Sequence, residues 1–115
     1  MKQSPIFIRT YDLLRWLIPA TVKFPREQRF VLAEAVQRTA LTWQEQIIEA
    51  AYSSTQRAKL READVTLTKL RTYLRLCHDL GLFTANQYAH ASHRVDELGR
   101  LLGGWLDTLK EPSRL

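Results

Sequence analysis

Apolar and small residues recur at alternating intervals of three and four positions in three long segments, which is the spacing of helices packed against other helices. Between Pro25 and about Tyr52 these positions are Ala33, Val36, Ala40, Trp43, Ile47 and Ala50. Between Leu60 and Leu80 they are Leu60, Ala63, Leu67, Leu70, Leu74 and Cys77. After Thr84 they are Tyr88, Ala91, Val95, Leu98, Leu102, Trp105 and Leu109. Each segment is predicted to form an amphipathic helix.

A further helix is predicted ahead of these three, with Thr10 as its N-cap and its end at about Val22. Its apolar residues are Tyr11, Leu13, Leu14, Trp16, Leu17 and Ile18. They lie on more than one side of the helix, which indicates two packing surfaces. Pro19 removes a backbone donor inside this pattern and predicts a kink near Arg15.

Short connections separate the predicted helices. Residues 53–55 are Ser-Ser-Thr and break the pattern before the third helix. Gly81 can adopt positive φ and is expected to end that helix. Thr84 and Gln87 form a capping-box pair, so the last helix is expected to start there. The fold predicted is an all-α, antiparallel, up-down-up-down four-helix bundle. Its predicted parts are a short N-terminal segment 1–9, the bundle 10–110 and a C-terminal tail 111–115.

Composition agrees with one globular domain. The chain has 115 residues, of which 45% are hydrophobic and 25% charged, as is usual for folded domains. Four glycines and four prolines supply few turns for an all-β fold. The single cysteine excludes an intrachain disulfide. No apolar run approaches the roughly 18 residues of a membrane span, and no signal-peptide pattern is present. We therefore expect a cytoplasmic protein with no membrane contact.

Positive charge is concentrated on the third predicted helix. The chain carries +5, and residues 55–76 hold six basic residues against two acidic ones. Arg57, Arg61, Arg71 and Arg75 fall within about 80° of one another and about 110° from the apolar seam, and we call these four the arginine face. With Lys69, they are the predicted nucleic-acid or polymerase contacts, because guanidinium groups bind phosphate bidentately. The alternative is an ordinary solvated helix face.

The sequence offers little chemistry for catalysis. It holds no glycine-rich phosphate loop, no nucleophile elbow and no Glu-x-x-His pair of a di-iron bundle. His90 and His93 share a helical face but lack a distinctive third ligand. Cys77 occupies a seam position, where a buried thiol is inert. We therefore expect no enzymatic activity, no metal and no cofactor.

Four blocks of the chain carry a resemblance to a known family. They are residues 11–19, 24–30, 69–75 and 98–106. Within the last block, adjacent Gly103 and Gly104 precede Trp105, which is costly in a helix unless close packing requires it. These three are predicted packing or assembly residues, and loss of Trp105 from a core would cost about 3–5 kcal/mol. The chain resembles the accessory variability determinant proteins of diversity-generating retroelements.

The resemblance implies a ring-like homopentamer of four-helix bundles that binds nucleic acid and the reverse transcriptase of its own element. Such proteins are required for copying template RNA into cDNA with adenine-directed errors. Arg71 and Arg75 match the paired arginines of the family's third helix, which are implicated in partner or nucleic-acid binding.

Two alternatives stay open at this point. The related four-helix proteins encoded in intervening sequences of bacterial 23S ribosomal RNA genes share the architecture without a retroelement. A purely structural, self-associating bundle is the third interpretation. Salt-dependent nucleic-acid binding separates the first two from the third.

Overall fold

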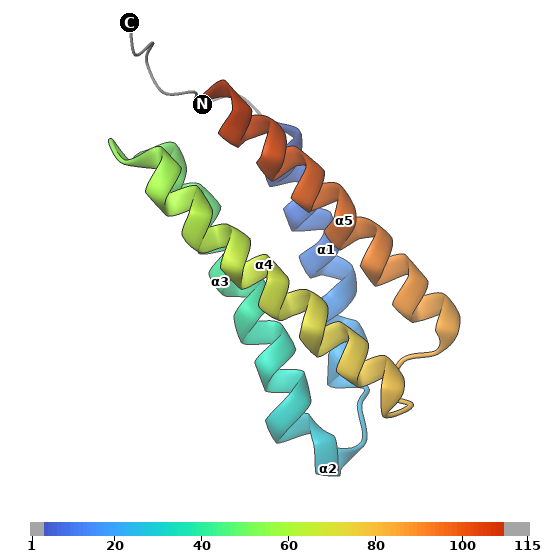
Figure 1. Cartoon of the computed structure of the whole chain (residues 1–115). Helices are drawn as coiled ribbons and strands as arrows, with labels where there is room; N and C mark the ends of the chain where they lie inside the picture. The colour runs from blue at the N-terminus through green and yellow to red at the C-terminus, as the bar shows by residue number, and fades with distance from the viewer. Residues whose placement is uncertain (1–3, 110–115) are drawn as a thin grey trace, which may run out of the picture.

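The computed structural model describes residues 4–109 and is helical throughout, with short connections (Figure 1). Its elements in chain order are α1 (Pro5–Val22), α2 (Arg26–Gln28), the π-helical turn η1 (Arg29–Ala33), α3 (Glu34–Ala51), α4 (Gln56–Asp79) and α5 (Ala85–Thr108). The four long helices run alternately up and down in a bundle of 57 × 22 × 22 Å. In it α1 and α4 lie on opposite corners, and each packs against both α3 and α5. The predicted all-α four-helix bundle is confirmed.

The start of the first helix differs from the prediction. Helix α1 begins at Pro5 rather than Thr10, because proline suits the first helical position, where its missing N–H is not needed. Residues 5–9 therefore belong to the bundle and not to a separate N-terminal segment. The helix continues through Pro19, and the kink near Arg15 stays a prediction. Residues 1–3 and the predicted tail 111–115 lie outside the described part of the chain.

Thr10, expected to be an N-cap, has a different role. Its side chain is buried inside the bundle and accepts a hydrogen bond of 2.8 Å from the indole Nε1 of Trp43 on α3. A fully buried indole N–H needs such an acceptor, because an unpaired buried donor is costly. The Thr10–Trp43 bond therefore joins α1 to α3 within the core.

The second predicted helix is confirmed in extent but not in regularity. It consists of α2, η1 and α3, and the sequence pattern did not predict the π-helical turn between them. Within η1, Leu32 and Ala33 are buried, whereas Phe30 and Val31 are exposed. The wider turn thus contributes two residues to the core and leaves two large apolar residues outside it.

The predicted seams form most of the core. All six seam residues of the second predicted helix, five on α3 and Ala33 in η1, are buried, and so are all six of α4. On α5 the seam residues Ala91, Val95, Leu98 and Leu102 are buried, while Tyr88, Trp105 and Leu109 at its two ends are only half-buried. None of the helices in residues 4–109 is long and apolar enough to cross a membrane.

Both predicted helix signals at the turn between α4 and α5 are confirmed. Gly81 has φ of 78°. Its amide donates to the His78 carbonyl at 3.0 Å, and the Leu82 amide donates to the Cys77 carbonyl at 2.8 Å, which together form a Schellman motif. Thr84 and Gln87 then form the capping box of α5. This turn sets the antiparallel pairing of the two helices.

We expect Thr10→Val to lower the free energy of unfolding by about 1–3 kcal/mol, because it leaves the Trp43 indole N–H buried without an acceptor. Chemical denaturation measures the change. The matched control is Thr68→Val, since Thr68 is exposed and its hydroxyl only donates to the Asp64 carbonyl of its own helix. Equal stability of the two variants would contradict a structural role for the Thr10–Trp43 bond.

Candidate nucleic-acid interface

Burial of the α4 seam determines where the arginine face points. Because Leu60, Leu67 and Leu74 are buried on one side of α4, residues about 110° away must lie beside the core, near solvent. Arg61 and Arg75 are indeed exposed, and Arg57 and Arg71 are half-buried. No residue of the arginine face enters the core.

Arg71 and Arg75 both have a carboxylate partner. The Nε atom of Arg71 lies 3.5 Å from Oδ1 of Asp96 on α5, and Nε of Arg75 lies 3.9 Å from Oδ2 of Asp79 on α4. The Arg71–Asp96 pair could not be predicted from local spacing, because only the fold brings α5 beside α4. The Asp79 pair could have been found from its i, i+4 spacing.

These ion pairs are solvated rather than sealed. The side chains of Arg71 and Asp96 are 41% and 58% exposed, and those of Arg75 and Asp79 are 76% and 59% exposed. Exposed pairs of this kind contribute little to stability, because water competes for both partners. A phosphate can therefore reach either guanidinium.

Arg57, Arg61 and Lys69 differ from this pair. Arg57 donates a hydrogen bond from Nη2 to the backbone carbonyl of Leu109 at the end of α5, so it serves at least in part to hold that end of the bundle. Arg61 is exposed and has no carboxylate within ion-pair distance among residues 4–109. Lys69 is exposed on α4 but lies about 120° from Arg75, outside the arginine face. Arg61, Arg71 and Arg75 are thus the members of the arginine face that lie near solvent on α4, with Arg71 and Arg75 one turn apart.

The predicted packing glycines do not pack within the subunit. Gly103 and Gly104 are exposed, and a Cβ atom at either position would meet nothing within 4 Å. Gly104 instead lines a cavity of about 540 Å³ at the end of the bundle, together with Phe7, Leu101 and Trp105. Neither glycine therefore makes room for a group of its own subunit, and the role of both in packing or assembly stays a prediction.

Trp105 is also less buried than expected. It is half-buried at the end of α5 and contacts Phe7 of α1 edge to face, with ring centroids 6.1 Å apart. The seam places Trp105 on the inner side of α5, but the bundle ends there before it can enclose the ring. Trp105 therefore links α1 and α5 at the rim of the core.

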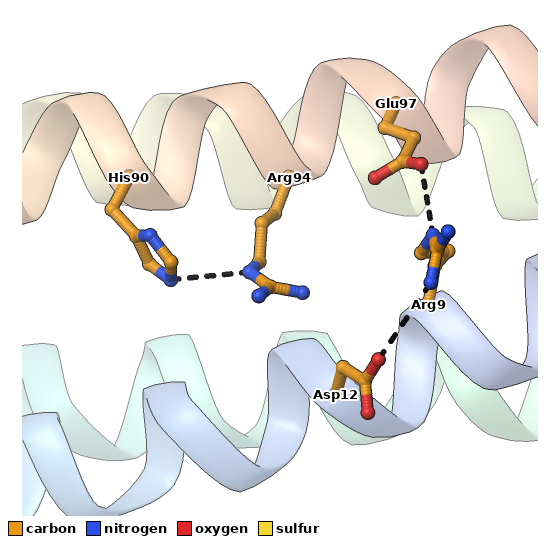
Figure 2. A network of polar contacts seen from close by, with 5 residues as sticks. All are labelled: Arg9, Asp12, His90, Arg94 and Glu97. Atoms are coloured by element: carbon orange, nitrogen blue, oxygen red, sulfur yellow. Dashed lines mark hydrogen bonds and ion pairs between the residues drawn. The ribbon is translucent and has the colours of Figure 1, made fainter.

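The side of the bundle between α1 and α5 carries other polar contacts (Figure 2). Arg9 of α1 donates to Glu97 of α5 at 2.9 Å and lies 3.9 Å from Asp12. Arg94 donates to Nε2 of His90 at 3.1 Å on the same helix. Arg9 therefore joins α1 to α5 through Glu97, whereas the partner of Arg94 lies on its own helix.

The remaining candidate groups are structural. Cys77 is buried in the core, and that burial raises the pKa of its thiol to about 11, as expected for an unreactive packing residue. His90 packs against Trp16, with ring centroids 4.7 Å apart. Within residues 4–109 no three histidine, cysteine or acidic side chains are grouped closely enough to hold a metal ion.

The fold and the exposed guanidinium groups define a small four-helix bundle with a net charge of +5 and a face of arginines on α4. A family model described as bAvd-like, for bacterial accessory variability determinant, matches residues 6–109. The chain belongs to this family. Membership implies an accessory protein of a diversity-generating retroelement, and the match indicates no family of enzymes. Among curated proteins no significant match was found.

We expect Trp105→Ala to lower the free energy of unfolding by about 1–2 kcal/mol, less than the 3–5 kcal/mol that a core tryptophan predicts. The reason is that the Trp105 side chain is only partly enclosed and lines the cavity at the end of the bundle. The reference variant is Trp43→Ala, because the Trp43 indole is fully buried and its loss should cost about 3–5 kcal/mol. Thermal denaturation of both variants measures the difference in stability. Equal losses would show that Trp105 is enclosed, for example by another subunit.

Proposed function

We propose that this chain is the accessory protein that binds the reverse transcriptase and nucleic acid of its retroelement during mutagenic copying of template RNA into cDNA. The observation that supports this most directly is that Arg61, Arg71 and Arg75 lie near solvent on one face of α4, about 110° from its buried seam. Membership of the bAvd-like family supplies the biological context.

The chemistry of the arginine face suits a polyanion. A guanidinium group donates several hydrogen bonds in a plane and keeps its charge at any physiological pH. Side chains four residues apart on a helix, such as Arg71 and Arg75, lie about 5–6 Å apart at Cβ. Two such groups on a rigid helix can contact successive phosphates or an acidic surface of the polymerase without a change of fold.

Self-association as a ring-like homopentamer is part of the proposal. The outer sides of α1 and α3 expose apolar residues, among them Ile8, Tyr11 and Ile48, which line a groove of about 310 Å³. Covering them with a second subunit would remove apolar surface from water. Five copies at +5 would carry about +25, which raises the local concentration of a nucleic acid at low salt.

We expect Arg71→Ala combined with Arg75→Ala to weaken binding of RNA or of the reverse transcriptase by at least about tenfold, because two charged hydrogen-bond donors are lost. Fluorescence anisotropy with a labelled single-stranded RNA measures this. Circular dichroism and the oligomer mass should be unchanged, since neither side chain is buried.

The matched control for this pair is Arg15→Ala combined with Arg26→Ala. Both residues are exposed on other helices, so the control removes the same formal charge away from the arginine face. If the two double variants lose affinity equally, then only net charge matters. If neither loses affinity, the face is merely solvated.

Wild-type affinity for RNA should fall steeply as salt rises, because binding to phosphates releases counterions. The slope of log affinity against log salt is expected to be about −0.7 to −0.9 for each phosphate contacted. Titrations at several potassium chloride concentrations give the slope. A flat response would count against phosphate recognition and would favour a purely structural bundle.

A further inference from the structure

Arg71 differs from its neighbours on the arginine face in the way its side chain is held. Arg61 and Arg75 are exposed over α4 itself, whereas the guanidinium group of Arg71 reaches α5. There its Nε atom lies 3.5 Å from Asp96, and its Nη2 atom lies beside the backbone of Gly99, one turn further along α5. The side chain thus crosses the groove between the two helices.

Gly99 makes room for this arrangement. A Cβ atom at position 99 would lie only 2.5 Å from Nη2 of Arg71, well inside van der Waals contact, and 3.7 Å from Cδ2 of Leu67. The backbone does not require glycine there, because Gly81 is the one glycine with positive φ in the described residues. Glycine weakens a helix interior relative to alanine. Glycine at this position therefore leaves room for the Arg71 guanidinium group beside the α5 backbone.

We propose that Gly99 is a positioning residue for Arg71, holding its guanidinium group ready for phosphate. This inference rests on the proposed function. Asp96 engages Nε, so the two Nη nitrogens keep N–H groups for a phosphate oxygen. A side chain already ordered in the free protein loses less conformational entropy on binding than a mobile one. Arg71 accordingly contributes more to affinity than its exposure alone would indicate.

The decisive variant is Gly99→Ala. The atom it would displace is the end of a flexible side chain rather than backbone, so the helix should fold while Arg71 moves off its position. Losing the pre-ordered contact should weaken binding of a labelled single-stranded RNA by roughly 2- to 10-fold. The slope of log RNA affinity against log salt should decrease in magnitude by about 0.7 to 0.9, which is the contribution of one phosphate contact.

Gly103→Ala is the matched control. It lies one turn away on the same helix, and a Cβ atom there meets nothing within 4 Å. Both substitutions raise helix propensity equally, so when the two variants have the same oligomer mass, a difference in RNA affinity between them reports the contact with Arg71. A second comparison uses the Arg71→Ala background, where Gly99→Ala should have no further effect on RNA affinity. The comparison also holds if Gly99→Ala alone folds poorly, because loss of the Arg71 side chain removes the close contact at position 99.

The outcomes separate this inference from the proposed function. The expected result is that Gly99→Ala binds RNA more weakly than Gly103→Ala does. In the Arg71→Ala background this difference should disappear. If Gly99→Ala and Gly103→Ala bind RNA equally, or if Gly99→Ala binds more tightly, then Gly99 does not position Arg71 for phosphate and only this inference fails. If the wild-type protein shows no salt-dependent RNA binding, both fail.

Discussion

The constraint on which the rest of the structure depends is the burial of one side of α4. Its six seam residues, from Leu60 to Cys77, are enclosed by α3 and α5. A helix held in this way cannot rotate without exposing several leucines, each worth about 1.5–3 kcal/mol when fully buried. The packing that stabilises the fold therefore also determines that Arg61, Arg71 and Arg75 face outward together.

Within this frame the four arginines are held to different degrees. Arg57 is bonded to the Leu109 carbonyl and Arg71 lies against Asp96 and Gly99, so both join α4 to α5. Arg61 and Arg75 lie over α4 alone, where Arg75 pairs with Asp79 of the same helix. Under the proposed function, the arginines that contact α5 would meet a phosphate in a fixed place, and the other two would meet it nearer to solvent.

The regular part of the fold could be predicted from spacing, because burial in a bundle repeats every three or four residues. The seams of α3 and α4 and the capping box at Thr84 are of this kind. Pro5 at the first helical position is a local signal that the spacing of apolar residues does not include, and the same spacing gives no sign of the π-helical turn η1. The Asp96 partner of Arg71 instead depends on contacts between distant segments. The spacing of apolar residues along the chain does not reveal those contacts. The open space around Gly103 could not be predicted for a related reason. A glycine that lowers helix stability indicates that something favours it there, but the sequence does not show whether a neighbouring group lies close to it.

The central claim is that α4 presents its guanidinium groups to nucleic acid. The most direct test is nuclear magnetic resonance of the arginine Nε–H groups in the assembled protein while a short single-stranded RNA is added. The account predicts that the signals of Arg61, Arg71 and Arg75 shift, while those of Arg15 and Arg38 on α1 and α3 stay in place. Shifts confined to α1 and α3, with the α4 arginines unchanged, would contradict it.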